Sequence, residues 1–167
     1  MSPVFTNQWC VRPETYEEPV RYVNVSRDRD VELRIDLEVD LPGPAGFFTS
    51  LPSPRAEAVL VNTGSKYTIF TAETAAKLGV VSDVARGDLW CIPSYDGRMI
   101  WVSMVRIPVK LGKDPRKIRV AFPLDPTRWR IRSDYPPSGN VLGMTDVLPN
   151  YMLCFTDEAL YSFPKLP

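Results

Sequence analysis

The sequence contains no histidine, and this absence excludes several kinds of catalytic site. Ser-His-Asp and Cys-His catalysis both need an imidazole as the general base, so neither is available in its usual form. Zinc sites with histidine ligands are excluded as well, and three scattered cysteines do not make a cysteine-only site. We therefore expect no metal and no cofactor, and any hydrolysis must be carried out by carboxylates.

An excess of either charge is also lacking, since 20 Lys and Arg residues balance 20 Asp and Glu residues. A neutral chain gives no reason to expect a nucleic acid or a membrane surface as a partner. No apolar run approaches the ~18 residues of a membrane span. Residues 1–8 also lack the basic start and the apolar segment of a signal peptide.

Cysteine is scarce, and the three that occur are Cys10, Cys91 and Cys154. Their odd number and wide separation favour buried free thiols over a disulfide. Free thiols are typical of a reducing compartment. Together with the missing signal peptide, they predict a cytoplasmic location.

The 167 residues are enough for one domain with a hydrophobic core. Residues 1–19 contain three prolines and no sustained period, which predicts an irregular N-terminal arm before a domain at residues 20–167. Residues 31–39 alternate apolar and charged side chains, as a strand with one wet face does. Further strands are predicted at residues 89–92, 99–111, 118–122, 152–155 and 160–163. The alternation in residues 99–111 slips near Val105, which indicates a bulge or a bend.

A short polar turn lies between two apolar segments near the middle of the chain. Residues 58–61 form a β-branched and apolar run that predicts a buried strand, and residues 67–70 predict a second one. Thr71 then has the character of a helix N-cap and Gly79 that of a helix stop. A turn held between two buried strands presents a side chain with little freedom, and here that side chain is Asn62.

This stretch resembles the active-site segment of the retropepsin-like aspartic proteases. Their signature is an apolar run, then Asp-Thr/Ser-Gly-Ala/Ser, a short strand, and a helix ending in Ala-x-x-Leu-Gly, which residues 75–79 match. Residues 140–148 resemble the family's apolar-apolar-Gly-x-Asp-x-Leu segment, with one extra residue between Gly143 and Asp146. The resemblance covers roughly residues 31–155. It implies a mostly β, single-domain acid-protease barrel with one or two short helices, the shorter one near Thr145.

The resemblance also implies the site. Asn62 stands at the position of the catalytic Asp, which is the main departure from the family. In the turn, Thr63 would buttress through its hydroxyl, Gly64 would allow close backbone approach, and Ser65 would hydrogen-bond within the turn. Leu142 and Gly143 would pack behind it. By position the flap tip would be Ser94, Tyr95, Asp96 and Gly97, although an ordinary hairpin turn is the alternative.

Aspartic proteases hold two carboxylates together with one shared proton, because two such charges cannot both ionise at close range. The chain has no second Asp-Thr/Ser-Gly motif, so the resemblance implies a homodimer that acts on a peptide or protein substrate. The amide of Asn62 cannot serve as a base, so we expect this chain to be inactive.

Two origins of Asn62 remain open. We favour an engineered Asp-to-Asn variant, because the turn has lost only the catalytic oxygen and keeps every neighbouring residue. The alternative is a natural pseudo-protease that serves as a peptide-binding or dimerisation module. A plain β-barrel without a peptide cleft is a weaker third possibility.

Overall fold

The computed structural model describes residues 20–22, 33–41, 54–94, 97–111, 115–125, 139–156 and 159–164. These residues form mostly β-strands, with two short helices between the fourth and fifth strands. The elements in chain order are β1 (Val20–Arg21), β2 (Arg34–Val39), β3 (Arg55–Val61), β4 (Thr68–Ile69), α1 (Ala72–Leu78), α2 (Val81–Ala85), β5 (Asp88–Pro93), β6 (Met99–Lys110), β7 (Arg116–Pro123), β8 (Val141–Leu142), β9 (Tyr151–Phe155) and β10 (Ala159–Pro164). The predicted mostly β class is confirmed. The predicted N-terminal arm lies outside the described residues.

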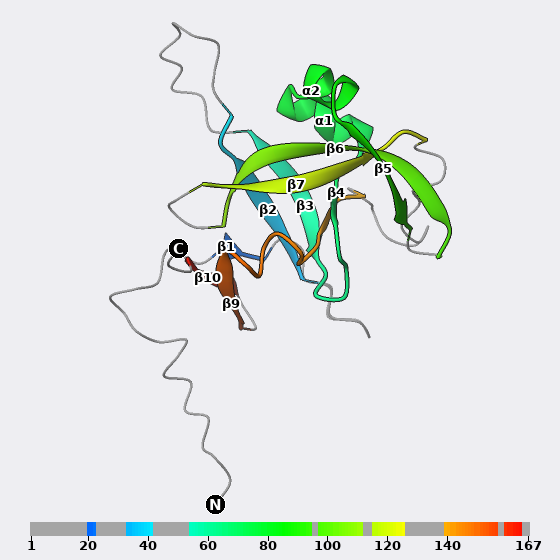
Figure 1. Cartoon of the computed structure of the whole chain (residues 1–167). Helices are drawn as coiled ribbons and strands as arrows, with labels where there is room; N and C mark the ends of the chain where they lie inside the picture. The colour runs from blue at the N-terminus through cyan, green and yellow to red at the C-terminus, as the bar shows by residue number, and fades with distance from the viewer. Residues whose placement is uncertain are drawn as a thin grey trace, which may run out of the picture.

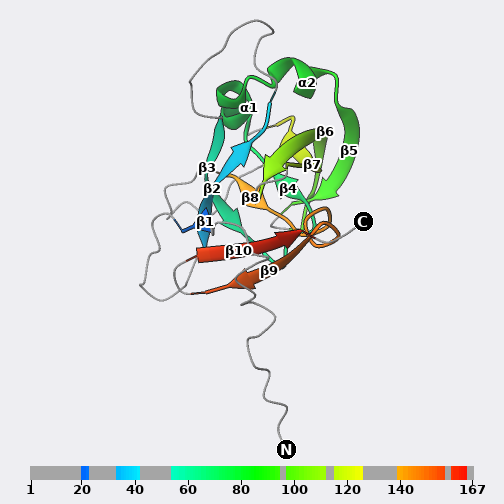
Figure 2. The same ribbon diagram turned by 90° about the vertical axis from the view of Figure 1, so that its left-hand side faces the viewer.

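The strands form two sheets. The larger has the order β2-β3-β8-β4-β7-β6-β5, and β2 also pairs with β6, so that this sheet curves back on itself. The β3–β8 and β4–β7 pairs are parallel, whereas β4 and β8 are antiparallel. The smaller sheet has the order β1-β10-β9. The two helices and the β9–β10 pair lie at opposite ends of the larger sheet (Figures 1 and 2).

The core is divided into two clusters, and β6 contributes a different face to each. Ile107 and Val109 are buried in the main cluster, whereas Ile100, Val102 and Met104 are buried in the second. The β6–β7 register runs without a shift from Val102 to Val109, so of the two predicted alternatives the bulge is wrong and the bend agrees with the curvature of β6 (Figure 1). The alternation slips because the long, curved strand buries one face near its start and the other face near its end (Figure 1).

The first helix follows its sequence signals. The Thr71 hydroxyl accepts a hydrogen bond from the Thr74 N–H at 3.1 Å, as an N-cap does. The helix stops at Gly79, whose φ of 72° lies in the left-handed region that glycine adopts without cost. Both predicted ends of this helix are confirmed.

The second helix is not where the sequence predicted it. Residues 145–150 form successive turns, because Pro149 has no N–H to continue a helical ladder. The helix lies instead at α2, shortly after the end of α1. There Val80 is buried and Val84 packs against the main cluster. Their spacing of four residues is that of one helical face.

The cysteine prediction is partly wrong. Neither Cys91 nor Cys154 forms a disulfide, as predicted, but Cys91 is exposed and Cys154 is half-buried. Cys91 pairs with Trp101 across the β5–β6 hairpin, and both side chains lie on its solvent face. Cys10 lies outside the described residues. In the described part of the chain, no helix is long and apolar enough to cross a membrane.

The N-cap provides a test of the local folding signals. We expect Thr71→Ala to lower the free energy of unfolding by about 1 kcal/mol, because it leaves a helical N–H without its acceptor. Thr71→Ser keeps the hydroxyl and should stay within about 0.5 kcal/mol of the parent. Urea unfolding of the three proteins measures both values. Equal loss in both variants would show that the methyl group, not the cap, stabilises this end.

Candidate active site

The predicted central turn begins where β3 ends, and its hydrogen bonds fix Asn62. The Asn62 N–H donates to the Leu142 carbonyl of β8 at 3.1 Å, and the Asn62 carbonyl accepts from the Ser65 N–H at 3.0 Å. The side-chain Oδ1 accepts from the Gly64 N–H at 3.0 Å. The backbone and the side chain of Asn62 are therefore both held within a single turn.

The remainder of the turn rests on the chain that follows β8. The Ser65 carbonyl accepts from the Met144 N–H at 2.9 Å, and the Lys66 carbonyl accepts from the Thr145 N–H at 3.0 Å. The Ser65 hydroxyl donates to the Tyr67 carbonyl at 3.0 Å, within the turn. Both ends of the turn, at Asn62 and at Ser65 and Lys66, are thus hydrogen-bonded to the backbone of residues 142–145.

Gly143 lies at the closest point of this contact. A Cβ atom on Gly143 would lie 2.3 Å from the backbone carbonyl of Tyr67, which is closer than real carbon atoms approach. The Gly143 N–H also donates to the buried Thr68 hydroxyl at 3.1 Å. Leu142 beside it is fully buried in the main cluster. The structure therefore brings Leu142 and Gly143 directly behind the turn that carries Asn62.

Thr63 and Gly64 form the exposed tip of the turn. An open pocket of about 750 Å³ lies beside them and includes apolar side chains from the segment after β8. Its lining residues are Thr63, Gly64, Ser65, Lys66, Met144, Thr145, Leu148 and Pro149.

The second predicted site element is the β5–β6 hairpin. Its strands pair up to Pro93 and Met99. The Ser94 N–H donates to the Arg98 carbonyl at 2.7 Å, and the Gly97 N–H donates to the Ser94 carbonyl at 3.0 Å. Gly97 has a φ of 80°, which a side chain would strain. Tyr95 and Asp96 lie outside the described residues, so the structure places only the two ends of the predicted flap tip.

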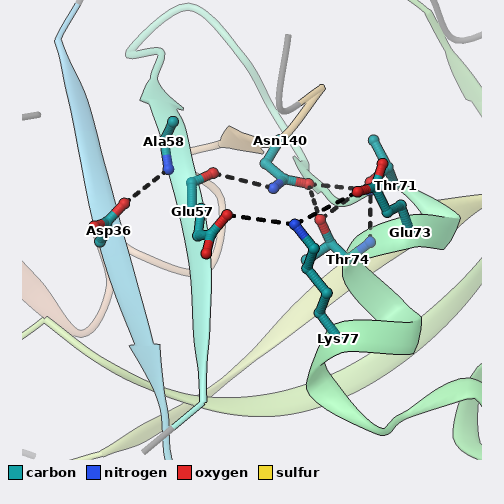
Figure 3. Close-up of polar contacts among 8 residues, drawn as sticks. All are labelled: Asp36, Glu57, Ala58, Thr71, Glu73, Thr74, Lys77 and Asn140. Atoms are coloured by element: carbon teal, nitrogen blue, oxygen red, sulfur yellow. Dashed lines mark hydrogen bonds and ion pairs between the residues drawn. The ribbon is translucent and has the colours of Figure 1, made fainter. Parts of the chain in front are cut away.

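Sequence reasoning missed Asn140, a buried amide that joins three segments. Its Oδ1 accepts from the Thr71 N–H at 3.1 Å and from the Thr74 hydroxyl at 2.9 Å, at the start of α1. Its Nδ2 donates to the Glu57 carbonyl of β3 at 3.3 Å (Figure 3). A lone asparagine before a short apolar run carries no signal of this role, because its partners are 66 to 83 positions away in the chain.

A charged pair also lies next to the turn. The guanidinium of Arg119 and the carboxylate of Asp146 approach to 2.6 Å, and the backbone N–H of Arg119 donates to the same carboxylate at 2.7 Å. The guanidinium carbon of Arg119 also lies 5.5 Å from the centre of the Trp90 ring, within cation–π range. Hydrogen bonding from Arg119 holds the pKa of Asp146 below its usual value. Asp146 is therefore a structural carboxylate and remains ionised near neutral pH.

No protein-family model and no curated protein matches the sequence. The structure is similar to the crystal structure of a retropepsin-like aspartic protease from Rickettsia conorii, with a TM-score of 0.50 and 18% sequence identity. The match covers 89% of this chain and 92% of that chain. The fold is retropepsin-like.

The retropepsin-like fold confirms the fold class expected from the two sequence motifs. At 18% identity the likeness establishes the fold alone, because one fold can host many unrelated functions. In the described part of the chain, no three His, Cys, Asp or Glu side chains lie together as a metal site.

The contact between Gly143 and Tyr67 can be tested by stability. We expect Gly143→Ala to lower the free energy of unfolding by about 3 kcal/mol or more, because backbone must move to admit the methyl group. Gly64→Ala is the matched control in the same turn, since its Cβ would meet only the Asn62 Oδ1 at 3.4 Å. Urea unfolding measures both. Similar losses in the two variants would contradict a specific close approach at Gly143.

The Arg119–Asp146 pair predicts a pH dependence of stability. Because the folded pKa of Asp146 is lowered, its contribution is fully present above the usual Asp value of ~4 and is lost as the pH falls through the folded pKa. We expect Asp146→Asn to be less stable than the parent at neutral pH, and the difference to shrink at pH ~2 to ~3. Urea unfolding at both pH values measures this, and an unchanged difference would contradict it.

Proposed function

We propose that this chain is a retropepsin-like aspartic endopeptidase in which Asn62 replaces the catalytic Asp, so that this form is inactive. The observation that carries the proposal is the geometry of Asn62. It follows the buried Val61 at the end of β3 in a retropepsin-like fold, and its Oδ1 is fixed by the Gly64 N–H at 3.0 Å. An aspartate could accept the same hydrogen bond through one oxygen and leave its second oxygen for chemistry.

The proposed reaction needs two such oxygen atoms from two chains. One carboxylate takes a proton from a bound water, whose oxygen then attacks the peptide carbonyl carbon, while the protonated partner carboxyl donates to the carbonyl oxygen. The tetrahedral intermediate collapses with cleavage of the C–N bond, and the amine leaves with a proton. Because each chain supplies one carboxylate, the active form is a homodimer with its site on the two-fold axis.

The other predicted residues have roles in the same proposal. Thr63 would buttress the turn, and its exposure leaves it accessible to the second copy. Gly64 and Ser65 complete the turn, while Leu142 and Gly143 support it from behind. The hairpin that includes Ser94 and Gly97 would be a flap that closes over an extended peptide and excludes water.

Asn62 is also compatible with a second function, which is peptide binding without cleavage. Its amide oxygen accepts the Gly64 N–H hydrogen bond that an aspartate would also accept, so the shape of the proposed cleft does not require a catalytic carboxylate. A natural pseudo-protease would use that cleft to bind an extended peptide by strand addition. We favour an engineered Asp-to-Asn change, because only one oxygen separates this turn from a catalytic one.

Restoring the carboxylate tests the proposed function. We expect Asn62→Asp to cleave peptides, or its own chain, at least ~100-fold faster than the parent, because a general base contributes on the order of 10²- to 10⁴-fold. Mass spectrometry of each protein with a synthetic peptide library, between pH ~4 and pH ~7, measures the products. The faster cleavage should lie toward the acidic end, where one carboxyl of the pair keeps its proton.

Two controls complete this experiment. Asn7→Asp introduces the same charge in the predicted N-terminal arm and should leave the protein inactive. Sedimentation shows whether the Asn62→Asp protein is a dimer. If that protein is folded and dimeric yet cleaves nothing, the peptidase proposal is wrong, and peptide binding by the parent would support the pseudo-protease instead.

A further inference from the structure

Strand β3 contains one residue more than the strand it pairs with. Ile35 of β2 pairs with Val59, and Leu37 pairs with Ala56, so the register shifts between the two pairs. One residue of β2, Asp36, therefore lies opposite two residues of β3, Glu57 and Ala58. This arrangement is a β-bulge, and it lies four residues before Asn62.

The bulge reverses which face of β3 is buried. Ala56 is buried before it, and Val59 and Val61 are buried after it. Side chains alternate strictly between the faces of a strand, so an unbroken strand from Ala56 would turn residue 62 toward the core. With the extra residue, Val61 faces the core and Asn62 faces away from it, half-buried at the start of the turn. The bulge thus sets the face on which Asn62 is presented.

The backbone of the bulge is held by side chains from neighbouring segments. Ala58 has a φ of 46°, a left-handed conformation that residues other than glycine rarely adopt. Its N–H donates to the Asp36 Oδ1 at 2.9 Å, and its carbonyl accepts from the buried Arg34 guanidinium at 3.0 Å. The preceding Glu57 carbonyl accepts from the Asn140 amide at 3.3 Å.

Figure 3 shows the bulge between Asp36 on β2 and Asn140 on the far side. An extra residue interrupts the regular ladder, and buried backbone groups left without a partner are costly. Asp36 is the residue directly opposite the bulge, and it supplies the acceptor for the strained residue itself. Its position and its hydrogen bond both point to the same role.

We propose that Asp36 is a positioning residue that holds the β3 bulge and thereby directs the side chain at position 62 into the active site. Asp36 contacts the backbone of Ala58 rather than the reacting groups. It acts through the register of β3, so its removal misplaces residue 62 without altering it. This inference rests on the proposed peptidase function, and its experiment separates the two.

The test uses the Asn62→Asp protein and the peptide that it cleaves best. We expect Asp36→Ala in that background to lower kcat by about 10- to 100-fold with little change in KM, because small misplacements of a reacting group cost rates of that order. Asp36→Asn keeps an acceptor oxygen for the Ala58 N–H and should retain most of kcat. Glu38→Ala is the matched control on the same strand, where Glu38 pairs with Lys110 at 3.5 Å, and it should leave kcat unchanged.

A rescue distinguishes positioning from general destabilisation. Glycine adopts a positive φ without a Cβ penalty, so Ala58→Gly should restore roughly tenfold of the kcat lost in Asp36→Ala. Thermal unfolding of all variants shows that each is folded at the assay temperature. Asp36→Ala alone could fail to fold. In that case the proposal requires that the Asp36→Ala, Ala58→Gly double variant folds and keeps at least a tenth of the kcat of the Asn62→Asp protein, because Asp36 is assigned no role other than holding the bulge.

A second readout applies to the parent protein and needs no activity. The Gly64 N–H donates to the Asn62 Oδ1, so its amide resonance reports where the side chain of residue 62 points. We expect Asp36→Ala to shift the Gly64 resonance and Glu38→Ala to leave it in place. An unmoved Gly64 resonance, or a kcat in Asp36→Ala equal to that of Glu38→Ala, overturns the positioning role. An inactive Asn62→Asp protein in which Asp36→Ala still shifts Gly64 overturns only the peptidase proposal.

Discussion

The site depends on the close contact of two backbone segments, the turn after β3 and the chain around Gly143. Strand β8 lies between β3 and β4 in the sheet, so the turn that joins β3 to β4 passes across the end of β8. Only a residue without a Cβ can lie there, because the Tyr67 backbone occupies that space. This contact fixes how close the turn lies to β8. The hydrogen bonds from the Met144 and Thr145 N–H groups to the carbonyls of Ser65 and Lys66 fix the direction of the turn. A preorganised turn of this kind holds a side chain in one geometry before any ligand arrives.

The hairpin and the turn are connected through the second hydrophobic cluster. Ile92 and Ile100 are buried near the tip of the hairpin, one pair before the strand pairing ends, and Tyr67 and Trp90 pack against the same cluster. The rings of Tyr67 and Trp90 meet edge to face at 6.3 Å, and Arg119 links Trp90 to Asp146 beyond β8. The hairpin is therefore packed, through this cluster, against Tyr67 at the end of the turn.

The sequence predicted features that depend on neighbouring residues and missed those that depend on distant ones. The ends of α1 were correct because Thr71 and Gly79 act within one helical turn. The second helix was misplaced because α2 is stabilised by the packing of Val84 against the main cluster, and the residues of that cluster come from distant parts of the chain. The site motif was visible in sequence because its turn is contiguous. The sequence did not indicate that Asn140 and Asp36 hold the backbone of β3, because their partners lie tens of positions away and asparagine and aspartate are common in loops.

The structure separates the geometry of the site from its chemistry. Gly143 and β8 fix the depth of the turn, and the bulge opposite Asp36 fixes the face on which residue 62 lies. Neither constraint involves the side chain of residue 62 itself. That side chain contributes one hydrogen bond to the turn, through an oxygen that asparagine and aspartate share. An exchange between the two would therefore change the proton chemistry of the proposed site and leave its shape intact, so the proposed peptidase and the alternative peptide-binding form would share one geometry.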